Sequence, residues 1–213
     1  MLLNLVKKDI LLVKKYLPLM MILPFAIPVL VMVQVPQLLG LSAFIVSAIF
    51  SVFMLYQYVL MAEMKYPKAE ALLCSTPYSR SIIVKARYTF LLLIFAYCCG
   101  AYNILALIFS KIKYLTLYNY IIALLILVIL FGVYMPIQYK LGFEKTKYFF
   151  MILILGTPLV IPLLIRAHIK FQFTGLFKLS MFFHYLILIV FIMAILFTSI
   201  NISIKVYSKK ELK

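Results

Sequence analysis

The chain has 213 residues, of which 67% are hydrophobic and 12% are charged, and its formal net charge is +16. Soluble domains are about half apolar and about one quarter charged, so this composition excludes a soluble globular protein and indicates an integral membrane protein. The length predicts one transmembrane domain over residues 1–213, without a separate soluble domain.

Residues 1–16 are predicted to form a short amphipathic helix. Polar side chains recur on one side of it at helical spacings, and these are Asn4, Lys7, Lys8, Lys14 and Lys15. The apolar side is expected to carry Leu3, Val6, Ile10 and Val13. Such a helix can lie in the membrane interface with its lysines toward anionic headgroups. A cleaved signal peptide is the alternative, but no small-residue cleavage site follows a short apolar core.

Six apolar runs follow, each near the length that crosses a bilayer, at residues 17–35, 41–62, 89–110, 117–139, 148–165 and 179–203. None of them contains Lys, Arg, Asp or Glu, as expected because one such charge at mid-bilayer costs about 2.5–3.5 kcal/mol. Pro24 and Pro28 are expected to interrupt the first run. Pro158 and Pro162, together with Gly156, leave open whether the fifth run forms one helix or two short helices.

The basic residues indicate the orientation of these runs. With both termini in the cytoplasm, sixteen of the twenty-one lysines and arginines fall in inner segments, and five fall in outer segments. All five acidic residues also fall inside. This bias follows the positive-inside rule, so the net charge of the chain describes a membrane topology and gives no indication of nucleic-acid binding.

Several chemical motifs are missing from the sequence. No Gly-x-x-x-x-Gly-Lys-[Ser/Thr] run is present, so no Walker A loop is predicted in this chain. No Cys/His cluster has zinc spacing, and no paired carboxylates lie at membrane depth for acid–base catalysis. His168 and His184 are interpreted as interfacial polar residues. We therefore predict no catalytic residue, no metal and no cofactor in this chain.

The longest charged interval, residues 63–88, separates the second run from the third. Pro67 suits the first turn of a helix, and Pro77 disfavours helical conformation in the residue before it. Ser79 can cap the next helix, which is expected to continue through Arg87 into the third span. Two interpretations remain open: a short helix held across the ends of two spans, or a solvated loop with a basic side facing the membrane.

The same interval carries a family resemblance, since residues 62–88 read AEMKYPKAEALLCSTPYSRSIIVKARY. A basic amphipathic start, a pair of spans and this run resemble the small permeases of the ATP-binding-cassette (ABC) type 2 exporter family. In that family a leucine-rich run of the form LxxTPxSRxxIVxARY joins the second and third spans. The subgroup that the chain most resembles includes the staphylococcal phenol-soluble-modulin exporters and related peptide exporters. Glu63 departs mildly from the pattern, because many relatives carry several acids there.

The resemblance implies a coupling helix that seats in a groove on a separate ATPase subunit, which would hold ATP and magnesium. It also implies a dimer of permeases, of like or unlike chains, with two ATPases. The residues expected to contact the ATPase are Lys68, Glu70, Ala71, Leu72, Leu73, Ser75, Thr76, Pro77, Ser79 and Arg80. The predicted fold is an all-α integral membrane protein with six transmembrane helices, an N-terminal interfacial helix and a cytoplasmic coupling helix between spans two and three.

The predicted function is that of a permease subunit of an ABC exporter in the bacterial cell membrane. Because the spans hold no charge, a small ion would lose its hydration without a counter-ion, so an amphipathic peptide or lipophilic compound is the expected substrate. Candidate pathway residues are Gln34, Gln57, Tyr97, Asn103, Tyr134 and Gln138. The alternative function is that of a membrane-embedded lipid-modifying enzyme or scaffold without an ATPase partner. A neighbouring gene for a Walker A ATPase would favour the exporter.

Overall fold

The fold is helical throughout the part of the chain that the computed structural model describes, which comprises residues 2–65, 79–148, 152, 156 and 181–209. Five of its helices are long, and a short helix precedes them. In chain order the helices are α1 (Leu2–Leu12), α2 (Leu17–Gln34), the short 3-10 helix η1 (Pro36–Leu38), α3 (Leu41–Met64), α5 (Arg80–Ile108), α6 (Leu117–Leu141) and α8 (Met181–Ser208). The expected all-α class is confirmed for these residues.

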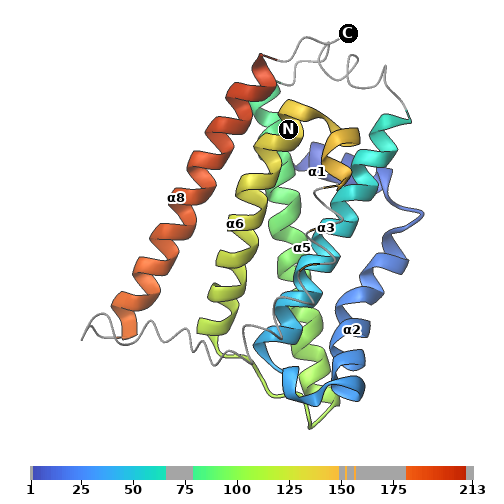
Figure 1. The fold of residues 1–213 in the computed structure, drawn as a ribbon, viewed down its shortest axis with the longest axis vertical. Helices are drawn as coiled ribbons and strands as arrows, with labels where there is room; N and C mark the ends of the chain where they lie inside the picture. Colours follow the sequence, from blue (N-terminus) through green and yellow to red (C-terminus); the bar gives the residue numbers. More distant parts are fainter. Residues whose placement is uncertain (1, 66–78, 149–151, 153–155, 157–180, 210–213) are drawn as a thin grey trace.

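The five long helices run side by side, and α1 lies across them near one end (Figure 1). That end, at the top of Figure 1, also holds the last turn of α3, the first turn of α5 and the last turn of α8. We call it the α1 end of the bundle. Segments that are far apart in the sequence therefore meet there.

The bundle consists of two helix pairs joined by α5. The helices α2 and α3 pack on each other, as do α6 and α8, and α5 contacts both pairs and α1. Aromatic rings strengthen the smaller contact between α3 and α6. Phe53 and Phe131 stack with ring centroids 4.1 Å apart, and Tyr134 meets Phe53 edge-on at 5.4 Å. Such pairs add about 0.5–1.5 kcal/mol beyond the area that they bury.

The prolines of α2 and the glycine at the end of α6 show how the chain forms these two helices. Pro24 and Pro28 do not end α2, which continues as a helix through both of them. Each proline lacks an N–H group and removes one helical hydrogen bond. Membrane-spanning helices tolerate proline because neighbouring groups and small local adjustments satisfy the freed carbonyl. At the end of α6, Gly142 has φ +80°, a conformation that side chains with a Cβ disfavour. Its N–H donates to the carbonyl of Gln138 and closes the helix.

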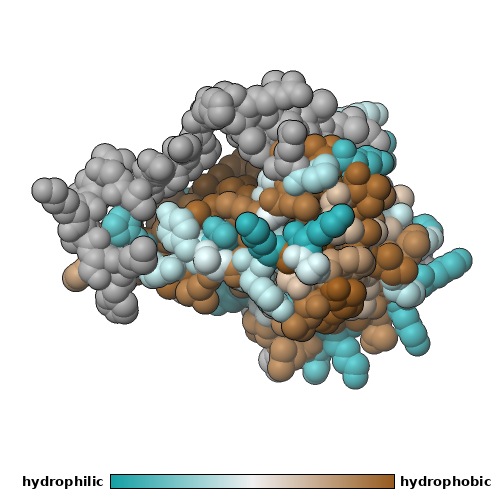
Figure 2. Space-filling view, turned by 90° about the horizontal axis from the view of Figure 1, so that it is seen from below, coloured by the Kyte–Doolittle hydropathy of each residue, from teal (hydrophilic) through white to brown (hydrophobic). Residues whose placement is uncertain are grey.

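Within the described ranges, five helices are long and apolar enough to cross a membrane: α2, α3, α5, α6 and most of α8. Their outward side chains are mostly apolar, as Leu107, Ile108 and Phe197 illustrate with exposed fractions of 73%, 67% and 68%. The view from the end opposite α1 likewise shows hydrophobic residues over much of the described surface (Figure 2). The fifth predicted run, residues 148–165, lies almost wholly outside the described residues.

The apolar side predicted for residues 1–16 divides between the bundle and the surface. Val6 and Val13 are buried, whereas Leu3 is 72% exposed and Ile10 39% exposed. The buried side of α1 instead carries Leu5, Val6 and Asp9, which are spaced for one face of a helix. This side packs on α5 and α3. The buried carboxylate of Asp9 forms an ion pair with Arg87 of α5.

Candidate functional site

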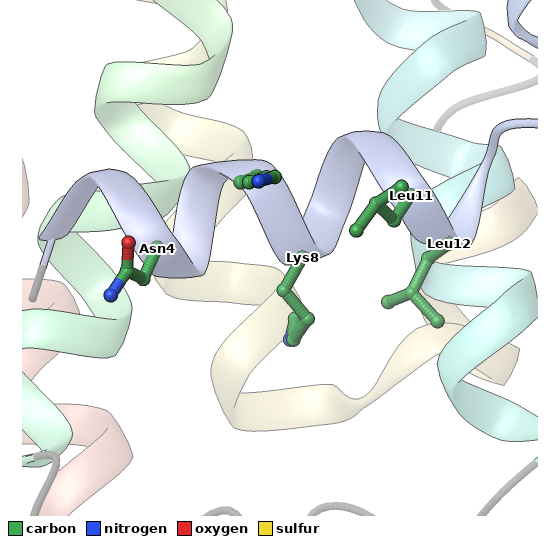
Figure 3. Close-up of a pocket in the computed structure, with 5 residues that line it drawn as sticks. Asn4, Lys8, Leu11 and Leu12 are labelled. Atoms are coloured by element: carbon green, nitrogen blue, oxygen red, sulfur yellow. The ribbon is translucent and has the colours of Figure 1, made fainter.

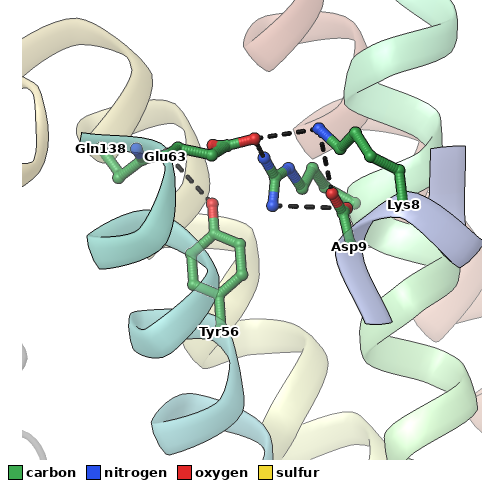
Figure 4. A network of polar contacts seen from close by, with 6 residues as sticks. Lys8, Asp9, Tyr56, Glu63 and Gln138 are labelled. Atoms are coloured by element: carbon green, nitrogen blue, oxygen red, sulfur yellow. Dashed lines mark hydrogen bonds and ion pairs between the residues drawn. The ribbon is translucent and has the colours of Figure 1, made fainter. Parts of the chain in front are cut away.

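Four charged side chains from three helices meet at the α1 end of the bundle (Figure 4). Asp9 of α1 pairs through Oδ2 with Nη1 of Arg87 on α5 at 3.3 Å, and through Oδ1 with Nζ of Lys8 at 3.1 Å. Glu63 of α3 accepts hydrogen bonds through Oε1 from Lys8 Nζ at 3.0 Å and from Nη2 of Arg87. We call these four residues the charge network. It ties α1 to α3 and to α5.

The charge network is graded from the interior to the surface. The side chains of Asp9 and Arg87 are 2% and 5% exposed, whereas those of Lys8 and Glu63 are 29% and 34% exposed. An isolated charge at the inner position would be costly to bury. The network contains two bases and two acids, so its formal charge sums to zero and each buried charge has an opposite partner. Removing one partner of such a group typically costs about 3–5 kcal/mol.

The helices place these groups through simple spacing. Asp9 follows Leu5 by four residues, so the packing that buries Leu5 against the bundle also turns the carboxylate inward. Glu63 is the second-last residue of α3, and Arg87 lies two turns inside α5. The charge network therefore holds together the two helices that flank residues 66–78. These residues, which include Lys68, Glu70, Ala71, Leu72, Leu73, Ser75, Thr76 and Pro77, lie outside the described part of the chain.

A second polar contact joins the start of α5 to the end of α8. Arg80 donates from Nη1 to the carbonyls of Ser208 at 2.7 Å and Tyr207 at 3.3 Å, and its guanidinium lies 6.0 Å from the centre of the Tyr207 ring. The last carbonyls of a helix have no partner inside the helix, and a basic side chain there also complements the helix dipole. Arg80, which we expected to contact an ATPase, thus bonds the carboxyl end of α8.

Ser79 occupies the N-cap position of α5, as the sequence predicts, with extended backbone angles of φ −65° and ψ 146°. Its hydroxyl makes no capping hydrogen bond to the helix and instead lies 2.9 Å from the hydroxyl of Ser81. The prediction of the helix start is therefore confirmed, while the expected side-chain cap is not formed. The role expected for Ser79 at an ATPase stays a prediction.

A buried polar seam continues from α5 into the α6–α8 pair. The Tyr88 hydroxyl lies 2.6 Å from the Ser199 hydroxyl and 3.0 Å from the Ser203 hydroxyl. Ser199 Oγ in turn donates to the carbonyl of Gly132 at 2.9 Å. Tyr88 follows Arg87 directly in α5. Arg87 contacts α1 and α3, whereas Tyr88 contacts α8. This arrangement makes the first three turns of α5 the junction between α1, α3 and α8.

Three of the candidate pathway residues lie between α3 and α6. Tyr56 donates to Gln138 Oε1 at 3.1 Å (Figure 4), and Gln57 Nε2 donates to the Tyr134 hydroxyl at 3.4 Å. Gln57, Tyr134 and Gln138 are all buried within this single chain. Their amides and hydroxyls hold the two helices together here. A role in a pathway stays a prediction.

The other three pathway candidates are more accessible. Gln34 is the last residue of α2 and is exposed. Tyr97 donates from its hydroxyl to the carbonyl of Met21 at 3.1 Å, which joins α5 to α2. Asn103 accepts a hydrogen bond at 2.8 Å from Tyr120 at the start of α6. The six candidates do not gather at one place in the described structure.

Sequence reasoning did not anticipate the charge network. Asp9 was counted only as an inner acid, Glu63 was noted as an inner acid that departs from the family pattern, and Arg87 was placed in the helix that leads into the third span. No contact between them was predicted. A usable signal was present, because a single acid among four lysines in residues 1–16 is unusual on a helix expected to face anionic lipid. No group of three or more His, Cys, Asp and Glu side chains within the described ranges is suited to hold a metal ion.

The long apolar helices define a helical multi-pass membrane protein. The sequence profile of the family described as "ABC-2 family transporter protein" matches residues 4–208, which is nearly the whole chain. The protein therefore belongs to the ABC-2 transporter family, and the family resemblance drawn from residues 62–88 is confirmed at this level. No curated protein and no solved structure gives a significant match.

Proposed function

We propose that the protein is the permease subunit of an ABC exporter and that a separate subunit hydrolyses ATP for it. The family match over residues 4–208 is the observation that carries this proposal. ABC-2 membership implies an ATPase partner in general, and it gives no support to the alternative of a lipid-modifying enzyme or scaffold. The finer assignment, to the phenol-soluble-modulin and related peptide exporters, rests on the motif in residues 62–88.

The described contacts support a route by which an ATPase would act on the bundle. In this proposal residues 68–80 seat on the ATPase, with Leu72 and Leu73 in an apolar groove. A push on this segment would reach both of its flanks, α3 and α5. Because Glu63 and Arg87 join these flanks to α1, and Arg80 joins α5 to α8, the movement would be distributed to α1 and α8 as well as to the two flanks.

The proposed orientation places the α1 end in the cytoplasm, because most of the bases lie in segments at that end. The proposed substrate is an amphipathic peptide or a lipophilic compound. The outward surfaces of the spans are mostly apolar and offer no fixed counter-ion for a small inorganic ion. A second permease copy, like or unlike, would complete the pathway between two such surfaces.

The test is co-expression with the Walker A ATPase encoded nearest to the protein, followed by purification and reconstitution in vesicles. We expect the two chains to purify together, and amphipathic peptides to stimulate ATP hydrolysis more than sugars or metal ions do. Leu72→Asp should abolish co-purification or stimulation, because truncating or charging a well-packed interface anchor costs about 2 kcal/mol or more. Lys111→Asp, on the loop at the opposite end of the bundle, is the matched control.

Two results would contradict this proposal. Stimulation by sugars or ions alone, with transport of the same species into vesicles, would overturn the substrate class. Full co-purification and full stimulation of the Leu72→Asp variant would place the ATPase contact elsewhere on the chain.

A further inference from the structure

An open groove runs along the outer side of α1, away from the charged pairs that α1 makes with α5 (Figure 3). Its lining has a polar half and an apolar half. Asn4, Lys7 and Lys8 line the half toward the N-terminus, and Leu11 and Leu12 line the other half. These residues follow one another at spacings of three and four along the helix, so they form one continuous stripe.

The polar half of the groove offers hydrogen-bond donors that are already held in place. Lys8 is the one member of the charge network that also lines the groove. Its ammonium has three N–H donors, and it donates a hydrogen bond to Glu63 at 3.0 Å. Asp9 lies 3.1 Å from the same ammonium as an ion pair, so the two carboxylates fix the position of the ammonium, and its other N–H groups can meet a ligand. Lys7 and Asn4 are exposed beside it.

The apolar half distinguishes between kinds of ligand. Leu11 is 55% exposed, and Leu12 is half-buried beside it. A soluble anion such as free phosphate would use the lysines and leave these leucines in water. A lipid would use both halves, because its phosphate can meet the basic residues while its glycerol and upper acyl chain cover the leucines. The charge and the apolarity of the groove are complementary to an anionic amphiphile.

We propose that this groove binds the headgroup of an anionic phospholipid. The phosphate accepts hydrogen bonds from Lys7, Lys8 and the Asn4 amide, and the start of an acyl chain lies along Leu11 and Leu12. Binding at Lys8 brings the lipid into direct contact with the charge network, so the lipid holds α1 against the bundle. The site does not depend on the proposed transport activity, since it is a property of the chain without an ATPase.

The experiment measures lipid binding to the purified full chain in neutral detergent by native mass spectrometry, without an ATPase. The probes are dioleoyl phosphatidylglycerol and the zwitterionic dioleoyl phosphatidylcholine. We expect phosphatidylglycerol to bind more tightly, and Lys7→Gln to weaken it about fivefold, as expected from the loss of one lysine near a lipid surface. Leu11→Gln should also weaken it. Lys7 and Leu11 lie outside the charge network, so both variants should retain the fold, which the thermal midpoint checks.

Lys14→Gln and Lys15→Gln are matched controls, because they remove the same charge from neighbouring exposed positions that do not line the groove. An equal loss in these controls would show a diffuse electrostatic attraction and overturn the site. Equal binding of the two lipids would do the same. Complete competition by inorganic phosphate, with no effect of Leu11→Gln, would assign the groove to a free anion and overturn the lipid proposal.

Discussion

Arg87 of α5 and Asp9 of α1 face each other at 3.3 Å between Nη1 and Oδ2, and neither side chain is more than 5% exposed. This pair makes the attachment of α1 specific. An amphipathic helix held only by apolar contacts could slide or lift away at a modest cost. Separating Asp9 from Arg87 would leave a buried charge with fewer partners, which is much more costly. The N-terminal helix is therefore an integral part of the bundle.

The first prediction concerns this pair. Asp9→Asn keeps the shape of the side chain and removes its charge, so Arg87 retains only Glu63 as an acidic partner. We expect the free energy of unfolding in detergent to fall by about 3 kcal/mol. Lys14→Gln, at an exposed position next to α1, should change it by less than about 0.5 kcal/mol. The measurement is chemical unfolding followed by the helical signal.

A double-mutant cycle separates the pair from its surroundings. Arg87→Gln alone leaves two acids without their main partner, whereas Arg87→Gln combined with Asp9→Asn removes opposite charges together. The loss in the double variant should be smaller than the two single losses added, by about 0.5–3 kcal/mol. Strict additivity would show that Asp9 and Arg87 do not interact in the folded protein.

The length of the apolar runs and the absence of charged residues from them were sufficient to predict the helical class and the positions of most helices. The runs at residues 41–62 and 117–139 agree closely with α3 and α6, and Ser79 marks the start of α5 as expected. The predicted third span began at residue 89, nine residues after the helix itself begins. A helix can continue beyond the membrane, and a hydropathy pattern reports only the apolar part of it.

The charge network could not be predicted in the same way. Each charged residue was assessed alone, and a lone Arg or Asp is expected to stay in water. Asp9 and Arg87 become compatible with burial only when α1 and α5 bring their opposite charges together. Their wide separation in the sequence conceals this contact. For the same reason the burial of Asp9 was not predicted, because its partner Arg87 lies on another helix, far along the chain.

The second prediction tests the contact between α5 and α8. Arg80→Gln removes the charge that bonds the Ser208 and Tyr207 carbonyls, an interaction worth about 0.3–1 kcal/mol at a helix end. We expect faster amide hydrogen exchange in the last turn of α8 and unchanged exchange in α2. Lys85→Gln, on an exposed side of α5, is the control. Unchanged exchange in α8 after Arg80→Gln would show that the contact does not hold this end in place.

The third prediction compares two helical glycines. A Cβ at Gly132 would lie 3.3 Å from Cγ2 of Ile195 and 3.7 Å from Cβ of Ser199, whereas a Cβ at Gly100 would meet nothing within 4 Å. Gly132→Ala gains helix propensity but should push α8 away from α6 at a larger cost, so the free energy of unfolding should fall by about 1 kcal/mol. Gly100→Ala should raise it by up to about 1 kcal/mol, because alanine favours the helix. Equal effects of the two substitutions would show that α6 and α8 are not closely packed at Gly132.

The last prediction is the orientation of the bundle in the membrane. Sixteen of the twenty-one bases lie in segments assigned to the cytoplasm, and moving such an excess across the membrane is disfavoured. Lys14 and Lys113 are both exposed and lie in segments assigned to opposite sides, so Lys14→Cys and Lys113→Cys report on the two sides separately.

In a background without native cysteines, a membrane-impermeant thiol reagent added to intact cells should label only the Lys113→Cys variant. Lysis before labelling should make the Lys14→Cys variant react as well, which controls for local accessibility. Labelling of the Lys14→Cys variant in intact cells, with protection of the Lys113→Cys variant, would reverse the orientation and would move the proposed ATPase contact to the wrong side of the membrane.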